Sequence, residues 1–429
     1  MESTSIHINN PAEFRREALA WANQFPIFAF YDSNGYGERL QHYDWILAVD
    51  SLKTLALNNA TGAFDLLEDF KHRHENSWLF GFLSYDLKND VEDLSSQHPN
   101  RLQSPELLFF EPRFLFRMSG NKLTINRSFL EATALVNIIN AYELPKEPFS
   151  KKIELFSNMN KEAYLERVRH IQNLIRHGEV YEVNLCRELA SYEVRINPLT
   201  TFLRINDVLR SPFSAYVKHE GLHILSFSPE RYLRKQGDEV ISQPIKGTAP
   251  IGETPEENEK IREALAANRK ERAENVMIVD LVRNDLAKTA IPGTVRVENL
   301  FEVQSFQTIN QMVSTVRAKV DPSYSSIDVI RNSFPMGSMT GAPKYRAMQV
   351  IDEVEMSRRG IFSGTIGYFS PDGDFDFNVV IRSVLYQEKE RYLSFTSGGA
   401  ITFDSDPEAE FEETLLKGAR IGELLFQYR

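Results

Sequence analysis

The sequence predicts an α+β protein, on three observations from different parts of the 429-residue chain. Short apolar runs separated by turn residues fill the first third and are typical of strands. Three longer stretches, at about residues 158–178, 254–288 and 408–428, space their apolar residues as helices do. A turn signal at 371–373 between two apolar runs predicts a hairpin near the carboxyl terminus.

The amino-terminal region, residues 1–150, is predicted to be rich in strands, with a few helices. The apolar run at 45–49 is one of these strands, and residues 11–23 form a predicted helix. Residues 144–152 hold two prolines and three lysines, which is typical of a linker. This linker is expected to lead into a second region, 151–429, that is intertwined with the first.

Local signals set the helix boundaries in the second region. Asn158 or Asn160 can cap the helix that ends at Gly178, and a strand is expected directly after it, over 180–189. A second helix is predicted to begin after Thr254, which is followed by a proline at the first helical position. Its pattern is expected to break near residue 268 and to end near residue 288.

The predicted hairpin pairs residues 366–369 with residues 375–385. On the second of these strands Asp376, Asn378 and Arg382 share a parity. Because alternate residues of a strand face the same side, we expect a polar face that could line a pocket.

Composition narrows the class of protein. The chain is 42% hydrophobic and carries a net charge of −11, which argues against nucleic acid and anionic membrane as partners. No apolar run approaches the roughly 18 residues of a membrane span. Cys186 is the single cysteine, so no internal disulfide can form. The amino terminus lacks a basic-then-apolar signal pattern, and we therefore expect a cytoplasmic protein.

Lys246 is the first candidate catalytic residue. It stands in the run Gln-Pro-Ile-Lys-Gly-Thr at 243–248, between an extended apolar strand and a Gly-Thr turn. Burial disfavours the charged form of a lysine, so the amine could become a nucleophile near neutral pH. The alternative is a solvated lysine in an ordinary turn.

Two Glu-x-x-Glu pairs suggest a metal site. Glu271 and Glu274 lie in one predicted helix, and Glu410 and Glu413 lie in the last one. Residues three apart share a helix face, so two such pairs brought together would make an all-oxygen site suited to Mg²⁺. The alternative is a pair of solvated acidic faces, and Lys417 has the spacing for a helix ion pair with Glu413.

Other segments could bind an anion or move a proton. The loop at 335–344 offers free amides and the Thr340 hydroxyl, and the run at 397–400 offers two glycines or a plain strand bend. Glu230 ends an apolar strand, where a carboxyl can act as a general acid, although it could instead pair with Arg231.

These segments occur together in an order that resembles the chorismate-utilising enzymes, a family that includes anthranilate, isochorismate and aminodeoxychorismate synthases. The resemblance is dense over about residues 155–429. The matching runs are residues 178–185, 228–230, 244–248, 272–285, 335–344, 364–368, 380–383 and 410–414, with a weaker match at 81–86. It implies an α+β fold with two facing antiparallel β-sheets, flanked by helices, and an active site between them.

The resemblance also implies roles for single residues. Glu274 and Glu413 are similar to the magnesium ligands of the family, with Glu271 and Glu410 in support. Glu230 resembles the acid that assists departure of the ring hydroxyl, and it is grouped here with Lys246, Gln311 and Thr340 as catalytic. The positions that resemble binders of chorismate are Gly247, Thr248, Tyr368, Arg382, Gly398, Gly399, Ala400 and Lys417.

Lys246 selects a branch within the family. The anthranilate branch usually has alanine at this position, whereas a lysine there is similar to the aminodeoxychorismate branch, in which the amine is thought to add to the ring at C2 before ammonia enters at C4. Isochorismate and salicylate synthases need a lysine at the position where this chain has Glu182. The residue that is common in the family at this position is glutamine. Gln311 stands where the family often has histidine, which disfavours pyruvate elimination because glutamine cannot shuttle a proton.

The expected partners follow from the same branch. The substrates implied are chorismate and ammonia, the cofactor is Mg²⁺, and the ammonia would come from solution or from a separate glutamine amidotransferase subunit. Cys186 lies within the chorismate motif and not in a glutaminase turn. Two alternatives stay open, an anthranilate-forming component I and a non-catalytic chorismate-binding subunit. No feedback-inhibitor motif stands out near the amino terminus.

Overall fold

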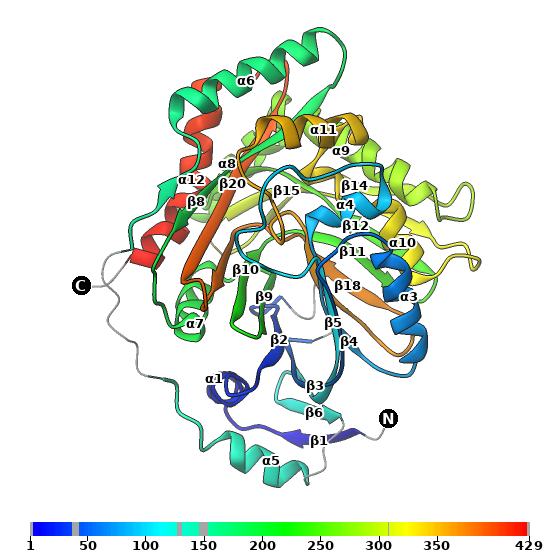
Figure 1. Ribbon diagram of the computed structural model, residues 1–429, viewed down its shortest axis with the longest axis vertical. Helices are drawn as coiled ribbons and strands as arrows, with labels where there is room; N and C mark the ends of the chain where they lie inside the picture. Colours follow the sequence, from blue (N-terminus) through cyan, green and yellow to red (C-terminus); the bar gives the residue numbers. More distant parts are fainter. Residues whose placement is uncertain (1–2, 37–42, 127–130, 146–152, 308, 427–429) are drawn as a thin grey trace.

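A computed structural model of the protein describes residues 3–36, 43–126, 131–145, 153–307 and 309–426 (Figure 1). The predicted linker at 144–152 therefore lies almost wholly outside the described residues. The amino-terminal region contains strands with intervening helices, as its alternating apolar runs predict. The elements are β1 Ser3–His7, α1 Pro11–Ala22, β2 Ile27–Asp32, β3 Trp45–Leu57, α3 Ala63–Arg73, β4 Leu79–Leu83, η1 Tyr85–Leu87, α4 Lys88–Val91, β5 Leu107–Ser119, β6 Lys122–Asn126 and α5 Ala132–Ile139.

The rest of the chain holds the longer helices and the remaining strands. The elements up to residue 305 are β7 Phe156–Ser157, α6 Lys161–Arg176, β8 Glu182–Ser191, α7 Pro198–Leu209, β9 Phe213–His219, β10 Leu222–Ser228, β11 Arg231–Gln236, β12 Glu239–Gln243, β13 Ile245–Pro250, α8 Pro255–Ala267, α9 Arg269–Ala287 and β14 Arg296–Ser305. They continue with β15 Ile309–Lys319, α10 Ser326–Ser333, η2 Gly337–Met339, β16 Gly341–Ala342, α11 Lys344–Val354, β17 Thr365–Phe369, β18 Phe375–Asn378, β19 Ser383–Gln387, β20 Tyr392–Ile401 and α12 Pro407–Phe426.

Antiparallel pairing links strands from distant parts of the sequence. β2 pairs with β3 on one side and with β9 on the other, and β4 pairs with both β5 and β17. Side chains of β2, β3 and β9 share one core with side chains of β11, β15 and β17. Two layers of strands therefore face each other across this core, and the predicted fold class is confirmed.

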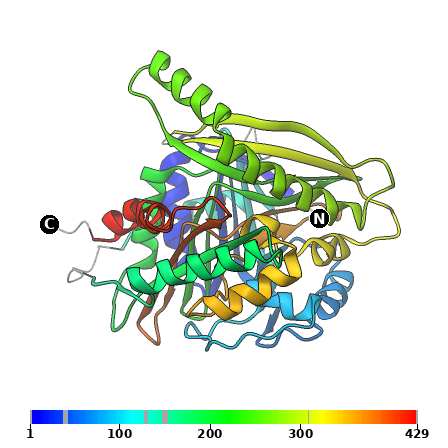
Figure 2. The ribbon, with the colours of Figure 1, turned by 90° about the horizontal axis from the view of Figure 1, so that it is seen from above.

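Helices cover the outer faces of the strands. The opposite faces of β2 and β3 pack against α1, α7 and α12 in a second core. Helices α6 and α11 pack on β8 in a third, and Figure 2 shows α6 and α11 beside α12 on one side of the molecule. No helix within the described ranges combines the length and the apolar character needed to cross a bilayer.

Two of the helices begin at caps that the sequence predicts, and a third begins at the predicted break near residue 268. The side chains of Asn160, Thr254 and Asn268 each accept a hydrogen bond from backbone N–H groups of the first turn of α6, α8 and α9. Asn268 therefore separates two helices at the break expected near residue 268. Gly178 follows α6 with φ of +76°, a conformation that glycine adopts without steric cost.

The predicted strand at 375–385 is wrong in its second half. β18 ends at Asn378, and β19 begins at Ser383 and pairs with β10 and β20 instead. Arg382 has φ of +50°, which an extended strand cannot contain. Asp376 pairs with Arg231, and Asn378 hydrogen bonds to backbone groups, so the continuous polar face that parity suggested does not form.

Candidate active site

Strands β8 and β13 and helix α9 bring three ionisable side chains together. The Lys246 Nζ donates a hydrogen bond of 2.9 Å to Oε1 of Glu182, and it lies 4.0 Å from Oε2 of Glu274. The Lys246 side chain is only 10% exposed, and that of Glu182 is 1% exposed. Lys246 is therefore not a solvated turn lysine but part of a buried charged group.

The backbone after Lys246 allows this arrangement. The pairing of β13 with β15 shifts register between Lys246 and Thr248, and Gly247 between them has φ of +78°. A Cβ on Gly247 would lie 3.1 Å from Oε2 of Glu271. Glycine is thus required here both by the left-handed backbone and by the approach of α9.

The charge state of Lys246 differs from the expectation based on burial. Burial alone would lower the pKa of Lys246, but the carboxylates of Glu182 and Glu274 outweigh it and hold this pKa above its ordinary value. The raised pKa favours the ammonium form of Lys246 in the absence of a ligand. Its amine becomes nucleophilic only when a neighbouring group accepts a proton, and Glu182 is the acceptor in direct contact.

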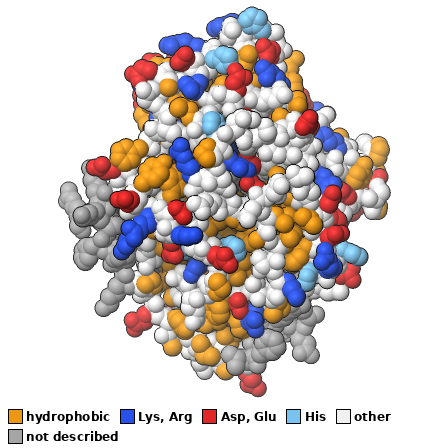
Figure 3. Space-filling view, viewed as in Figure 1, with side chains coloured by type: hydrophobic (Ala, Val, Ile, Leu, Met, Phe, Trp, Pro, Cys, Tyr) orange, Lys and Arg blue, Asp and Glu red, His pale blue; other side chains and the backbone are white. Residues whose placement is uncertain are grey.

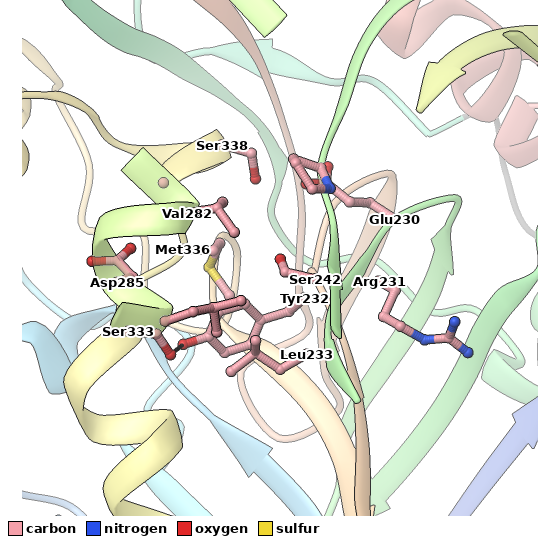
Figure 4. A pocket seen from close by; sticks show the side chains of 13 residues that line it. Glu230, Arg231, Tyr232, Leu233, Ser242, Val282, Asp285, Ser333, Met336 and Ser338 are labelled. Atoms are coloured by element: carbon pink, nitrogen blue, oxygen red, sulfur yellow. Dashed lines mark hydrogen bonds between the residues drawn. The ribbon is translucent and has the colours of Figure 1, made fainter. Parts of the chain in front are cut away.

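Glu230 has the environment of a general acid. It is 4% exposed, and burial raises its pKa to about 7, against the opposing effects of a hydrogen bond with Ser338 and of the charge of Lys246. A small cavity lies beside it, and Figure 4 shows Ser338 and Val282 across this cavity, whereas the side chain of Arg231 points away. Arg231 pairs with Asp376 at 3.0 Å, so it does not neutralise Glu230.

The two Glu-x-x-Glu pairs approach each other from α9 and α12. Lys270 connects them, because its Nζ lies 3.0 Å from Oε1 of Glu410 and 3.8 Å from Oε1 of Glu274. Burial raises the pKa of Glu274 to about 7, partly offset by the charge of Lys246. Glu271 also has a raised pKa, through burial and the charge of Glu413.

Gly399 of β20 lies close to the carboxylates of Glu410 and Glu413 on α12. A Cβ there would lie 3.4 Å from Oε2 of Glu410 and 3.5 Å from Oε1 of Glu413. Lys417 forms the predicted helix ion pair with Glu413 at 2.6 Å, and its Nζ also donates to the carbonyl oxygen of Gly398 at 3.0 Å. The backbone of β20 and the start of α12 therefore belong to the same site.

These carboxylates have the chemistry that a magnesium ion needs, because all the donors are oxygens. Oε1 of Glu274 is buried and has no hydrogen-bond partner, which leaves it available to a cation. Within the described ranges, however, no three His, Cys, Asp or Glu side chains already converge as metal ligands. The magnesium site therefore stays a prediction.

Arg382 is a half-buried cation for which no described carboxylate balances the charge. Burial lowers its pKa, with no opposing contribution from a carboxylate, and no described side chain forms an ion pair with its guanidinium. Its positive φ turns the chain out of β18 and into β19. A half-buried guanidinium without an acidic partner is suited to bind an anionic ligand.

Comparison with known proteins places this site in a family. Residues 28–422, most of the chain, match the family described as chorismate binding enzyme. The chain belongs to this family.

Three curated relatives share substantial sequence with this chain. Aminodeoxychorismate synthase component 1 of Salmonella typhimurium is 37% identical over 80% of this chain and 75% of its own length. The protein of the same name from Escherichia coli is 39% identical over 71% of this chain and 65% of its own length. Anthranilate synthase component 1 1 of Haloarcula marismortui is 37% identical over 61% of the chain and 53% of its own length.

Solved structures confirm the chorismate-binding fold. Anthranilate synthase component I from Streptococcus pneumoniae superimposes with a TM-score of 0.77 at 23% identity, covering 88% of this chain and 91% of that one. MenF, the menaquinone-specific isochorismate synthase from Escherichia coli, gives 0.79 at 17% identity, covering 99% and 94%.

Some predicted site residues make no described contact with the lysine–glutamate group, which consists of Lys246, Glu182 and Glu274. Tyr368 packs its ring against Tyr31, Trp78 and Phe80. Thr248 is exposed on β13. Their predicted part in substrate binding stays a prediction.

Three further predicted residues lie in the strands and loop that surround the group. Thr340 is fully buried, and its hydroxyl donates within its own loop, to the carbonyl oxygens of Met336 and Gly337. Gln311 lies opposite Thr248 on β15 and keeps a buried Oε1 without a hydrogen-bond partner. Ala400 of β20 is not among the residues with positive φ, so an alanine is accommodated there without backbone strain.

Sequence reasoning missed three residues of this site. Glu182 was considered only as evidence against a lysine-dependent branch, yet it is the direct partner of Lys246. Lys270 precedes the first glutamate of its pair and could have been noticed as a cation within an acidic segment. Ser338 carries no signal of its own, because a serine in a glycine-bearing loop is common.

Proposed function

We propose that the protein is an aminodeoxychorismate synthase component I. It aminates chorismate at C4 with ammonia and yields 4-amino-4-deoxychorismate, on the route to p-aminobenzoate and folate. The single observation that carries this proposal is the buried Lys246 amine, held by Glu182 beside the acid Glu230. Relatives at 37% identity or more carry the same name, which supports it.

The first half of the reaction replaces the ring hydroxyl. Lys246 gives one proton to Glu182, and its lone pair forms a bond to C2 of the ring. The ring double bonds shift, the C4–O bond breaks, and Glu230 gives its proton to the leaving hydroxyl, which departs as water. The enzyme then holds a secondary ammonium adduct, a protonated Glu182 and an ionised Glu230.

The second half transfers the amino group. Ammonia forms a bond to C4, the double bonds shift back, and the bond from C2 to the Lys246 nitrogen breaks. The released amine recovers its proton from Glu182, and Glu230 takes one from the ammonium of the product or from solvent. Chorismate and ammonia have then become 4-amino-4-deoxychorismate and water, and every enzyme group is restored.

Basic groups bind and orient the substrate in this proposal. Arg382, whose charge no described carboxylate balances, would bind one carboxylate of chorismate, and Lys417 and the amides of Gly398 and Gly399 would bind near the second. A magnesium ion held by Glu274 and Glu413, with Glu271 and Glu410, would neutralise charge on the substrate. Gln311 cannot move a proton at neutral pH, which suits an enzyme that stops before pyruvate is eliminated.

The ammonia is proposed to come from a separate glutamine amidotransferase subunit in the cytoplasm. The name of the bacterial relatives, component 1, supports a second subunit. Acidic and basic side chains are interspersed over the face in Figure 3, and the net charge of −11 also disfavours nucleic acid or an anionic membrane as a partner.

Product analysis tests this function. The purified chain is incubated with chorismate, magnesium and an ammonium salt, and the products are separated by mass. A product with the mass of 4-amino-4-deoxychorismate, without anthranilate fluorescence, is the expected result. Anthranilate as the main product would replace the proposal with the anthranilate-forming alternative, and unchanged chorismate would favour a non-catalytic chorismate-binding subunit.

A further inference from the structure

Lys270 is the one side chain among the described residues that contacts both glutamate pairs. It lies in the first turn of α9, and its Nζ is 3.0 Å from Oε1 of Glu410 on α12 and 3.8 Å from Oε1 of Glu274 on α9. Both carboxylates are buried, at 2% and 7% exposure. A single ammonium therefore lies between the two pairs.

The other lysines of the site do not contact Glu410. Lys246 contacts Glu182 and lies 4.0 Å from Oε2 of Glu274, and Lys417 contacts Glu413 within its own helix. Without Lys270, no ammonium of the described residues would contact Glu410, and the carboxylates of α9 and α12 would lose the cation that they share. Buried carboxylates without a counter-charge are costly, so Lys270 stabilises this contact in the absence of a metal.

Lys270 can also leave this position without being trapped. Its side chain is 43% exposed, in contrast to Glu274 and Glu410, so the ammonium can turn into solvent while the carboxylates stay buried. Oε1 of Glu274 accepts no hydrogen bond in its presence, which shows that Lys270 does not fully satisfy this oxygen.

We infer that Lys270 is an internal counter-cation that competes with the magnesium ion for Glu274 and Glu410. The inference rests on the magnesium site of the proposed function. In the free enzyme Lys270 holds the two pairs together and weakens metal binding. When the metal enters, Lys270 withdraws toward solvent, where its charge is available to an anionic substrate that arrives with the metal.

Magnesium titration without substrate tests this role. Isothermal titration of the whole chain with magnesium chloride compares the wild type with K270M, which keeps the length of the side chain, and with K270R, which keeps its charge. The change K260M, at an exposed lysine of α8, removes the same charge at a distance from the pairs. We expect K270M to bind magnesium at least about tenfold more tightly than the wild type, because two carboxylates lose a competing cation, whereas K270R and K260M stay close to the wild type.

Several outcomes would overturn the inference. Equal or weaker magnesium binding by K270M would show that Lys270 does not compete with the ion, and so would the absence of measurable binding in every variant. An equal gain in K260M would mean that net charge alone is responsible.

Thermal unfolding gives a second readout that needs no catalysis. Without magnesium, K270M should unfold at a lower temperature than the wild type, because the two helices then repel each other. Added magnesium should raise its unfolding temperature by more than it raises that of the wild type. An equal response of both proteins would count against the inference. Product identity enters neither measurement, so a failure of the proposed function is seen separately in the chorismate assay.

Discussion

Lys246 and Glu182 form a hydrogen-bonded ion pair at the centre of the site. Sequence motifs identified the lysine but not its charge state, because the pKa depends on a carboxylate 64 positions away in the chain. The same holds for Glu230, whose raised pKa comes mainly from burial that no local pattern reveals. Candidate reacting groups could therefore be proposed from the sequence, whereas the direction of their pKa shifts required the structure.

Replacing Lys246 by alanine should remove the nucleophile of the proposed reaction. We expect the rate of amination at saturating ammonium to fall by about 10²-fold or more, since the adduct at C2 can no longer form. The rate of 4-amino-4-deoxychorismate formation measures this, with K260A as a control. Wild-type kinetics in K246A would contradict the mechanism, whereas a shift toward anthranilate would be consistent with it.

The pKa of Glu230, raised to about 7 by burial, sets a pH dependence. The acid must hold its proton in order to give it to the leaving hydroxyl. Activity should therefore be retained below about pH 7 and fall by about tenfold for each pH unit well above it, as the protonated fraction declines. The pH profile of kcat/KM checks this, and E230Q, which has no proton to give, should be inactive across the range. A flat profile from about pH 6 to about pH 9 would exclude Glu230 as the acid.

Local sequence signals were sufficient to predict where helices begin but not where strands end. Asn160, Thr254 and Asn268 cap α6, α8 and α9 because a cap bonds to its own first turn. The end of β18 at Asn378 depends instead on β10, which pairs with β19 and draws the chain away. Sequence spacing likewise gave each glutamate pair but not the approach of α9 to α12.

The closeness of α9 and α12 predicts how the magnesium dependence of activity responds to E274Q. Glutamine keeps the size of the side chain and removes one negative charge and one strong oxygen ligand from α9. We expect the magnesium concentration needed for half-maximal activity to rise by about tenfold or more. Titration of activity with magnesium chloride measures it, and E256Q in the exposed first turn of α8 serves as a control. Unchanged magnesium dependence of E274Q would remove Glu274 from the metal site.

The predicted boundary between residues 1–150 and 151–429 does not coincide with a break in the pairing of strands. β2 lies between β3 and β9, and β4 lies between β5 and β17, so strands from both sides of residue 150 share one core. The strand-like apolar runs of the first region and the prolines and lysines at 144–152 suggest a boundary near residue 150. Pairing between strands more than 180 residues apart could be expected only from the resemblance.

This pairing predicts that residues 151–429 do not fold alone. Without the amino-terminal region, β9 and β17 lose a neighbouring strand and expose unpaired edges, which favour aggregation. We expect the truncated chain to be insoluble or to lack a cooperative thermal transition by circular dichroism. The full-length chain, prepared in parallel, should melt cooperatively. A soluble fragment with a sharp melt and bound chorismate would contradict this prediction.

The position of β4 also has a consequence during synthesis on the ribosome. One of its two edges is completed only by β17, at Thr365–Phe369, so it must wait until most of the chain has been translated. Until then the apolar strand β4 has an unpaired edge that is exposed in the nascent chain. The nascent protein therefore has a long interval in which chaperone binding would protect it, and folding of the finished sheet is largely post-translational.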